Sequence, residues 1–316
     1  MPPVASLDLG TNTFRLLIAD AISPDRLAPL ITKRAITRLG EGFAQGGVIQ
    51  PSVMNRSMAA LYDFARIIEE YHAKKVFAVA TSVVREAKNG EAFIEQIHKK
   101  TGIPVRILNG SEEARLTLKG VLSAVAQQTT NALVFDIGGG STEFILTEGN
   151  RPLKVESTPL GVVFLSETLP TSDPPTPQEL SRLSATIRKH LSLIDFHNLL
   201  PTVLPHGDPF PQSLIGTAGT VTTLAAIDQK METYDPGAIN NYRLSRETLL
   251  AIYQHLTTLT AVQRTAIPGL EKGRETVIIP GTAVVLEIMS LFGCNHLIVS
   301  DAGLLEGILL DRMDFH

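Results

Sequence analysis

The feature of the sequence that most constrains the fold is a short stretch that occurs twice. Residues 132–146, ALVFDIGGGSTEFIL, read as an apolar strand with an acid at its end, three consecutive glycines, two hydroxyl residues and a second apolar strand. Laid without gaps on residues 4–18, VASLDLGTNTFRLLI, this stretch aligns Asp136 with Asp8, 128 positions earlier. The repeat predicts an internal duplication, in which two domains face each other across a cleft.

The turn within the repeat is suited to bind phosphate. Gly138, Gly139 and Gly140 lack a Cβ, so the backbone can turn sharply and present its N–H groups to an anion, and Ser141 adds a hydroxyl donor. A dinucleotide-binding fingerprint or a P-loop opens a helix directly after its glycines, whereas a second strand follows here. The sequence therefore predicts two phosphate-binding hairpins and argues against a Rossmann domain.

Composition limits the class of protein. A chain of 316 residues with 44% hydrophobic and 19% charged residues suits two globular domains. No apolar stretch is long enough to cross a membrane, and Asp8 comes too early for a secretory signal, so a cytoplasmic protein is expected. A lone cysteine, Cys294, excludes an internal disulfide and a cysteine metal cluster. The formal charge of −4 argues against general nucleic-acid binding.

Periodicity and capping residues predict further elements. Helices are expected at 51–72, 91–100 and 281–292, and strands at 76–80, 105–108, 213–215 and 297–299. Ser111 is the expected N-cap of another helix, and residues 34–47 read as a glycine-rich mobile loop or a plain connector. The proline-rich segment 170–211 reads as a connection that encloses one helix, which begins with a capping box at Thr176.

Several polar residues at the ends of expected elements have more than one interpretation. Thr81 and Ser82 with Arg85 could hold a phosphate, or they could be a helix cap followed by a surface arginine. Gly216, Thr217, Gly219 and Thr220 form a glycine and hydroxyl turn before a helix, a weak signal for an anion site. Glu112 and Glu113 in a first helical turn are usually only partners of the helix dipole. Spacing alone leaves these alternatives open.

Taken together and in this order, the pieces resemble the exopolyphosphatase and guanosine pentaphosphate phosphohydrolase family of the actin, sugar kinase and heat-shock ATPase superfamily. The resemblance covers nearly the whole chain, through the stretches DLGTNTFRLLI (8–18), ATSVVREAKN (80–89), NGSEEARL (109–116), FDIGGGSTEF (135–144), GTAGTVTTLA (216–225), RTAIPGLEKGRETVIIPG (264–281) and SDAGLLEGIL (300–309). Threonine at positions 11 and 13, where serine is common in the family, is a small departure that keeps a hydroxyl. The chain looks like the short, two-domain form of the family.

The resemblance implies an α/β fold of two ribonuclease-H-like domains that face a central cleft. The first is expected to comprise residues 1–126, with the terminal helix 302–316 packed back on it, and the second residues 127–301. The two domains are expected to close on the substrate as rigid bodies about a hinge near 125–131.

The resemblance also implies roles for individual residues. Glu113 matches the family's catalytic glutamate, which positions and deprotonates the attacking water. Asp136 and Glu143 match carboxylates that organise the water and a divalent cation, Mg²⁺ or Mn²⁺, with Asp8 as a further ligand. The residues expected to bind the phosphates are Thr11, Asn12, Arg15, Thr81, Ser82, Arg85, Gly138, Gly139, Gly140, Ser141, Gly216, Thr217, Gly219, Thr220 and Arg264.

The implied activity is release of orthophosphate from the ends of inorganic polyphosphate. Two alternatives stay open: hydrolysis of the guanosine pentaphosphate alarmone at its 5′ end, and a non-catalytic sensor of either ligand. Glu113, Asp136 and Glu143 speak against a sensor, because a pure binder has no need of a water-activating acid. No sugar pocket or peptide-binding domain is evident. The sequence leaves open the preferred chain length, the metal and the oligomeric state, a homodimer included.

Overall fold

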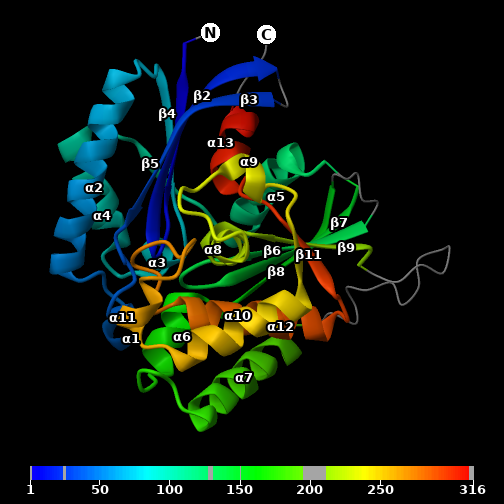
Figure 1. Ribbon diagram of the computed structural model, residues 1–316. Helices are drawn as coiled ribbons and strands as arrows, with labels where there is room; N and C mark the ends of the chain where they lie inside the picture. Colours follow the sequence, from blue (N-terminus) through cyan, green and yellow to red (C-terminus); the bar gives the residue numbers. More distant parts are fainter. Residues whose placement is uncertain (1, 24–25, 127–130, 150, 195–210, 313–316) are drawn as a thin grey trace. The chain divides into compact units, whose positions relative to one another are not determined.

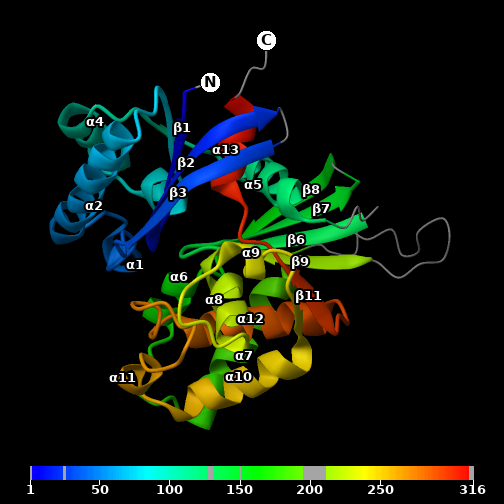
Figure 2. The same cartoon turned by 45° about the horizontal axis from the view of Figure 1, so that its top comes forward.

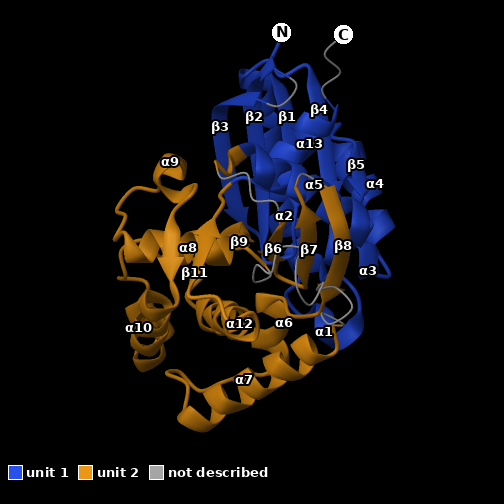
Figure 3. Ribbon diagram, turned by 90° about the vertical axis from the view of Figure 1, so that its right-hand side faces the viewer, with its two compact units in different colours: residues 1–123, 302–316 blue, residues 124–301 orange. Residues whose placement is uncertain are grey.

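The computed structural model describes the chain except for residues 1, 24–25, 127–130, 150, 195–210 and 313–316. The chain forms two compact units (Figure 3): unit 1 comprises residues 1–123 and 302–316, and unit 2 comprises residues 124–301. The chain thus returns to unit 1 after it has completed unit 2. The expected hinge at 125–131 lies largely outside the described residues.

Unit 1 is built on a five-stranded mixed sheet in the order β3-β2-β1-β4-β5 (Figure 1). Its strands are β1 (Val4–Leu9), β2 (Thr13–Ser23), β3 (Arg26–Ile36), β4 (Lys75–Ala80) and β5 (Val105–Ile107). Its helices are α1 (Phe43–Gly46), α2 (Pro51–Glu70), α3 (Ser82–Glu86), α4 (Gly90–Thr101), α5 (Gly110–Ala124) and α13 (Leu304–Arg312). Strands β1 to β3 are antiparallel, whereas β4 runs parallel to β1 and β5 parallel to β4.

Helices cover both faces of the unit 1 sheet (Figure 1). Helix α2 turns an apolar stripe that includes Met58, Leu61 and Phe64 toward a core shared with α4, as its periodicity predicts. On the other face α13 packs against β1, and its contact with α5 is very close. A Cβ on Gly120 would lie only 1.8 Å from the carbonyl oxygen of Gly303, so the backbone of α5 touches the segment that leads into α13.

Unit 2 has a six-stranded sheet in the order β10-β11-β9-β6-β7-β8 (Figure 2). Its strands are β6 (Asn131–Ile137), β7 (Thr142–Glu148), β8 (Arg151–Thr158), β9 (Ser213–Thr217), β10 (Arg243–Ser245) and β11 (His296–Val299). Its helices are α6 (Val162–Thr168), α7 (Pro177–Ser192), α8 (Ala218–Asp228), α9 (Pro236–Ile239), α10 (Arg246–Thr258), α11 (Ala261–Arg264) and α12 (Ile278–Leu291). Helix α12 is buried along most of its length and packs on α7, α8 and α10.

The two sheets repeat one topology. The order β8-β7-β6-β9-β11 in unit 2 matches β3-β2-β1-β4-β5 in unit 1. The register matches as well, because Asp8 pairs with Arg15 between β1 and β2, and Asp136 pairs with Glu143 between β6 and β7. The chain therefore has the predicted α/β fold of two ribonuclease-H-like domains, and the strand order agrees with the duplication read from the repeated stretch.

Local signals located some elements well and others poorly. The capping box at Thr176 is confirmed, because the Thr176 hydroxyl accepts from the Glu179 N–H at the start of α7. The N-cap predicted at Ser111 is wrong. The Asn109 Oδ1 accepts from the Glu112 N–H at 2.9 Å, and the Glu112 carboxylate accepts from the Asn109 N–H at 3.3 Å. This reciprocal cap starts α5 at Gly110, before Ser111.

The predicted loop 34–47 is partly wrong, because β3 continues through Arg34 to Ile36 and only then does the chain leave the sheet. Here β3 pairs along β2 as a third strand. Many of its residues are polar because it lies at the exposed edge of the sheet, so the sequence does not show the apolar pattern of a strand. Among the described helices, none combines the length and the apolar character required to cross a membrane.

Candidate active site

The hairpin of unit 1 holds a buried carboxylate. Asp8 at the end of β1 is 5% exposed, and its Oδ2 accepts from Arg15 Nη2 at 2.7 Å and from Arg15 Nε at 3.0 Å. Its Oδ1 is buried and has no hydrogen-bond partner among the described residues. Because buried carboxylate oxygens are normally paired, this oxygen is a natural ligand for a cation.

The turn of the same hairpin is joined to the start of α3. The hydroxyls of Thr11 and Ser82 lie 2.9 Å apart, and both side chains are buried, as are those of Asn12 and Thr81. Strands β1 and β4 are parallel neighbours, with Leu9 beside Ala80, so the residues that follow both strands meet at one edge of the sheet. The structure therefore brings together four of the polar residues predicted for phosphate binding, Thr11, Asn12, Thr81 and Ser82.

Arg85 and Glu113 form an ion pair in the same unit. Arg85 Nη1 lies 3.1 Å from Glu113 Oε2 and also donates to the carbonyl oxygen of Leu108 at 2.8 Å. The two side chains are 27% and 13% exposed. Glu113 lies in the first turn of α5, where the helix dipole and the guanidinium both favour negative charge. Arg85 is thus a partner of the predicted catalytic acid.

In unit 2, the first N–H groups of α6 donate hydrogen bonds to the carbonyl groups of the glycine turn. Val162 N donates to Gly138 O at 3.0 Å and Val163 N to Gly139 O at 2.9 Å. The carbonyl and the following N–H of a trans peptide point in opposite directions, so the N–H groups of Gly139 and Gly140 point away from α6. A Cβ at Gly161 would lie 2.3 Å from Gly139 O, so only glycine allows this approach. The turn is therefore built to present N–H groups to an anion.

Glu143 is held in place by two hydroxyl groups. The side chain is 3% exposed, and its Oε1 accepts from Ser141 Oγ at 2.6 Å and from Ser157 Oγ at 2.9 Å. Ser157 lies on β8, where it pairs in register with Glu143. It was not predicted from the sequence. One signal could have found it. Ser157 is a hydroxyl residue in the strand that follows β7, and neighbouring antiparallel strands place side chains opposite each other.

The turn from Gly216 to Thr220 connects β9 to α8, as expected for an anion site at a helix N-terminus. Thr217 and Thr220 are buried. A Cβ on Gly219 would lie 2.2 Å from Arg274 Nη2, so this guanidinium lies directly on the first turn of α8. Arg274 is 6% exposed, and its Nε donates to Glu271 at 2.6 Å. Arg274 is not among the residues that the sequence predicts to bind phosphate.

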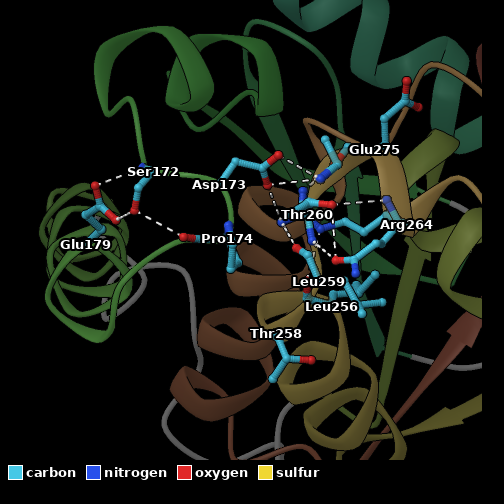
Figure 4. Close-up of polar contacts among 12 residues, drawn as sticks. Ser172, Asp173, Pro174, Glu179, Leu256, Thr258, Leu259, Thr260, Arg264 and Glu275 are labelled. Atoms are coloured by element: carbon cyan, nitrogen blue, oxygen red, sulfur yellow. Dashed lines mark hydrogen bonds and ion pairs between the residues drawn. The ribbon is translucent and has the colours of Figure 1, made fainter.

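The guanidinium of Arg264 is occupied by contacts within the protein (Figure 4). It is 4% exposed, and its Nε, Nη1 and Nη2 donate to the carbonyl oxygens of Leu256, Glu275 and Leu259 at 3.0, 2.8 and 2.7 Å. Its Nη2 also lies 3.3 Å from Asp173, which accepts from the first N–H of α11. Desolvation lowers the pKa of the Arg264 guanidinium, and the Asp173 carboxylate opposes that shift. We therefore remove Arg264 from the phosphate-binding set, because its donors bind backbone carbonyls.

The carboxylates predicted to bind metal do not form a complete protein cage. Among the described residues, no three His, Cys, Asp or Glu side chains gather closely enough to hold a metal ion. Mg²⁺ usually needs only one or two carboxylates, because waters and substrate phosphates complete its octahedral shell. The unpartnered Oδ1 of Asp8 is suited to such a site.

Comparison with known proteins identifies relatives along the whole chain. The sequence model of the Ppx/GppA phosphatase family matches residues 18–316. Exopolyphosphatase 2 of Mycobacterium tuberculosis is 34% identical, and the alignment covers 97% of both chains. A bifunctional 3-dehydroquinate synthase/phosphatase of Fusobacterium nucleatum is 32% identical over 98% of this chain, which corresponds to 46% of that longer protein.

Solved structures agree with these sequence matches. The Ppx/GppA family member of Aquifex aeolicus is 30% identical and superimposes with a TM-score of 0.79, covering 98% of this chain and 97% of its own. An exopolyphosphatase from Cytophaga hutchinsonii is also 30% identical, with a TM-score of 0.88 and coverage of 99% of both chains.

Proposed function

The chain belongs to the Ppx/GppA phosphatase family, and we propose that it is an exopolyphosphatase that hydrolyses the terminal phosphoanhydride of inorganic polyphosphate. The observation that carries the proposal is the pair of Glu113 and Arg85, which sets a carboxylate able to accept a proton beside a cation able to bind phosphate. The name of the Mycobacterium tuberculosis relative supports polyphosphate as the substrate.

In the proposed reaction Glu113 accepts a proton from the water that attacks the terminal phosphorus. The P–O bond to the next phosphate breaks, and orthophosphate and a chain shorter by one phosphate leave. This reaction needs little covalent help from the protein, because most of the barrier reflects charge and orientation. Glu113 therefore acts as general base, while its attachment to Arg85 fixes its direction.

Charge neutralisation comes from two kinds of donor. The N–H groups of Gly139 and Gly140 and the hydroxyl of Ser141 suit the equatorial oxygens of a phosphoryl group, as does the Thr11, Asn12, Thr81 and Ser82 set of unit 1. Arg15 and Arg85 add guanidinium groups, each of which also pairs with a carboxylate of unit 1.

A bound Mg²⁺ or Mn²⁺ would neutralise phosphate oxygens and polarise the scissile bond. Asp8 would hold it through Oδ1, with Asp136 and Glu143 as the remaining acids of the predicted set. The hydroxyls of Ser141 and Ser157 keep the Glu143 carboxylate oriented whether or not the cation is bound.

The test is to measure phosphate release from polyphosphate, guanosine pentaphosphate and ATP side by side, with Mg²⁺, with Mn²⁺ and with a chelator. An exopolyphosphatase gives the highest kcat/KM on polyphosphate and loses activity in chelator. A preference for guanosine pentaphosphate would make the alarmone the substrate instead. Tight binding of either ligand without phosphate release would mean that the protein is a sensor.

A further inference from the structure

A second basic site lies in unit 1 at the edge where α2 ends and β4 begins. An open pocket of about 520 Å³ is lined there by Arg66, Ile68, Glu69, His72, Lys74 and Thr101. Thr101 is the last residue of α4, so the pocket is shared by the carboxyl-terminal ends of two helices.

The lining itself is nearly neutral, because Arg66 is paired with Glu70 and Lys74 is balanced by Glu69. The excess of positive charge comes from lysines beside the pocket, in a chain whose formal charge is −4. Lys74 lines it, Lys75 follows in the chain, and Lys99 and Lys100 lie in the last turn of α4 next to Thr101. All four lysines are exposed, and none has an ion-pair partner among the described residues. Arg66 is paired with Glu70, and Glu69 is the one carboxylate in the lining.

The lysines of α4 have an ordinary role, since cations at a helix carboxyl end complement its dipole. Lys74 precedes β4 and Lys75 is its first residue, so that role does not account for them. His72 is also unusual, because it adopts a left-handed conformation with φ 53° directly after α2. Glycine is the usual residue at that position. A histidine there costs backbone strain and adds an imidazole to the lip of the pocket.

The pocket lies at the opposite edge of the sheet from the phosphate-binding residues. Strand β4 begins at Lys75 beside the pocket and ends at Ala80, next to Thr81 and Ser82. At about 3.3 Å per residue, these two ends are roughly 17 Å apart. A small phosphate compound at the hairpin is too short to reach the pocket, whereas a long polyanion has the length to span this distance.

We propose that this basic pocket binds an internal stretch of a long polyphosphate chain while the end of the same chain is hydrolysed. The identity of the ligand rests on the proposed function. Lysines act as point charges without directional demands, which suits a uniform chain of anions. The lining includes no Phe, Tyr or Trp on which a nucleobase could stack, so the pocket favours polyphosphate over single-stranded nucleic acid.

The experiment compares the double variant Lys74→Gln/Lys100→Gln with the control Lys33→Gln/Arg151→Gln, which removes two exposed cations on β3 and β8. Both double variants change the net charge equally. For long-chain polyphosphate we expect the pocket variant to raise KM about threefold or more, and to lower the slope of log affinity against log salt by about one per cation removed. KM and kcat for tripolyphosphate should stay at parent values, and the control should resemble the parent.

Affinity is also measured in full-length protein that carries Glu113→Gln, so that binding is read without turnover. Unchanged long-chain affinity in the pocket variant would overturn the proposal, as would an equal loss for tripolyphosphate. If the parent hydrolyses no polyphosphate, the proposed function is wrong. The binding comparison then still tests whether the pocket binds polyphosphate. Loss of binding to single-stranded RNA or to phosphatidylserine vesicles, with polyphosphate affinity intact, would also overturn the proposal and assign the pocket to that partner.

Discussion

One nitrogen of Arg85, Nη1, serves both the Glu113 carboxylate at 3.1 Å and the Leu108 carbonyl at 2.8 Å. Its Nε and Nη2 have no hydrogen-bond acceptor among the described residues, and the side chain is 27% exposed. The guanidinium can therefore bind a phosphate along its free edge without releasing the acid. We therefore expect a phosphate bound by Arg85 to lie next to the proposed general base.

Replacing Glu113 with glutamine should lower the kcat for polyphosphate roughly 10²-fold or more with little change in affinity, because the variant cannot accept the proton. The matched control is Glu112→Gln, which changes the neighbouring acid and keeps a side chain able to cap α5. Steady-state kinetics and equilibrium binding separate the two effects. Parent-like kcat in Glu113→Gln would remove Glu113 from the mechanism.

Replacing Gly161 with alanine should displace the backbone of the glycine turn. The added methyl would lie 2.2 Å from the Gly140 carbonyl carbon and 2.3 Å from Gly139 O, so the turn must move. We expect kcat/KM for polyphosphate to fall about tenfold or more, with cooperative unfolding retained. In the control Gly46→Ala, the methyl meets only Val48 Cγ2 at 3.6 Å, and activity should stay at the parent level. Full activity in Gly161→Ala would show that the turn does not bind substrate.

Replacing Arg264 with alanine should destabilise the protein by about 3 kcal/mol, because a buried guanidinium and its hydrogen bonds to three backbone carbonyl groups are lost. Lysine should not rescue it, since an ammonium cannot span acceptors arranged around a planar guanidinium. Urea unfolding measures the loss, with the exposed Arg188→Ala as a control expected within about 0.5 kcal/mol of the parent. A variant of parent stability with a raised KM for polyphosphate would return Arg264 to the substrate site.

Glu179 should make stability depend on pH in the acid range. Hydrogen bonds from the Ser172 side chain, and then from the Thr176 and Ser172 backbone, lower the pKa of its carboxyl to about 2 (Figure 4). A pKa depressed in the folded state adds stability above the unfolded value, and that stability is lost as pH falls toward the folded pKa. The parent should therefore exceed Glu179→Gln in urea midpoint near pH 6, and the difference should shrink from about pH 4.5 toward pH 2. A difference that is constant with pH would contradict this assignment.

Signals that lie close together in sequence predicted much of the fold. The strand, glycine turn and strand of each hairpin, the apolar stripe of α2 and the capping box of α7 depend on neighbouring residues, and each was found. Asn109 and Ser111 were harder to separate, because both are good N-caps. Glu112, three residues after Asn109, decides between them.

Contacts set by tertiary packing were not predictable from local patterns. Arg264 and Arg274 look alike in sequence, as cations near one loop. Packing encloses Arg264 among backbone carbonyls and sets Arg274 against Gly219. Ser157 and Gly161 likewise reach Glu143 and the glycine turn only after β8 and α6 have folded back on β7. The site could be predicted where its residues are contiguous, and not where distant segments complete it.

The backbone contact between Gly120 and Gly303 has a consequence for the order in which the molecule is made. Nascent domains generally fold as they emerge, with the amino-terminal one first. Here every residue of unit 2 precedes position 302, whereas unit 1 lacks α13 until residues 304–312 have been synthesised. Unit 1, which begins earlier, therefore cannot complete its packing until the whole sequence of unit 2 has been synthesised. The helix that carries Glu113 meets α13 only after that point.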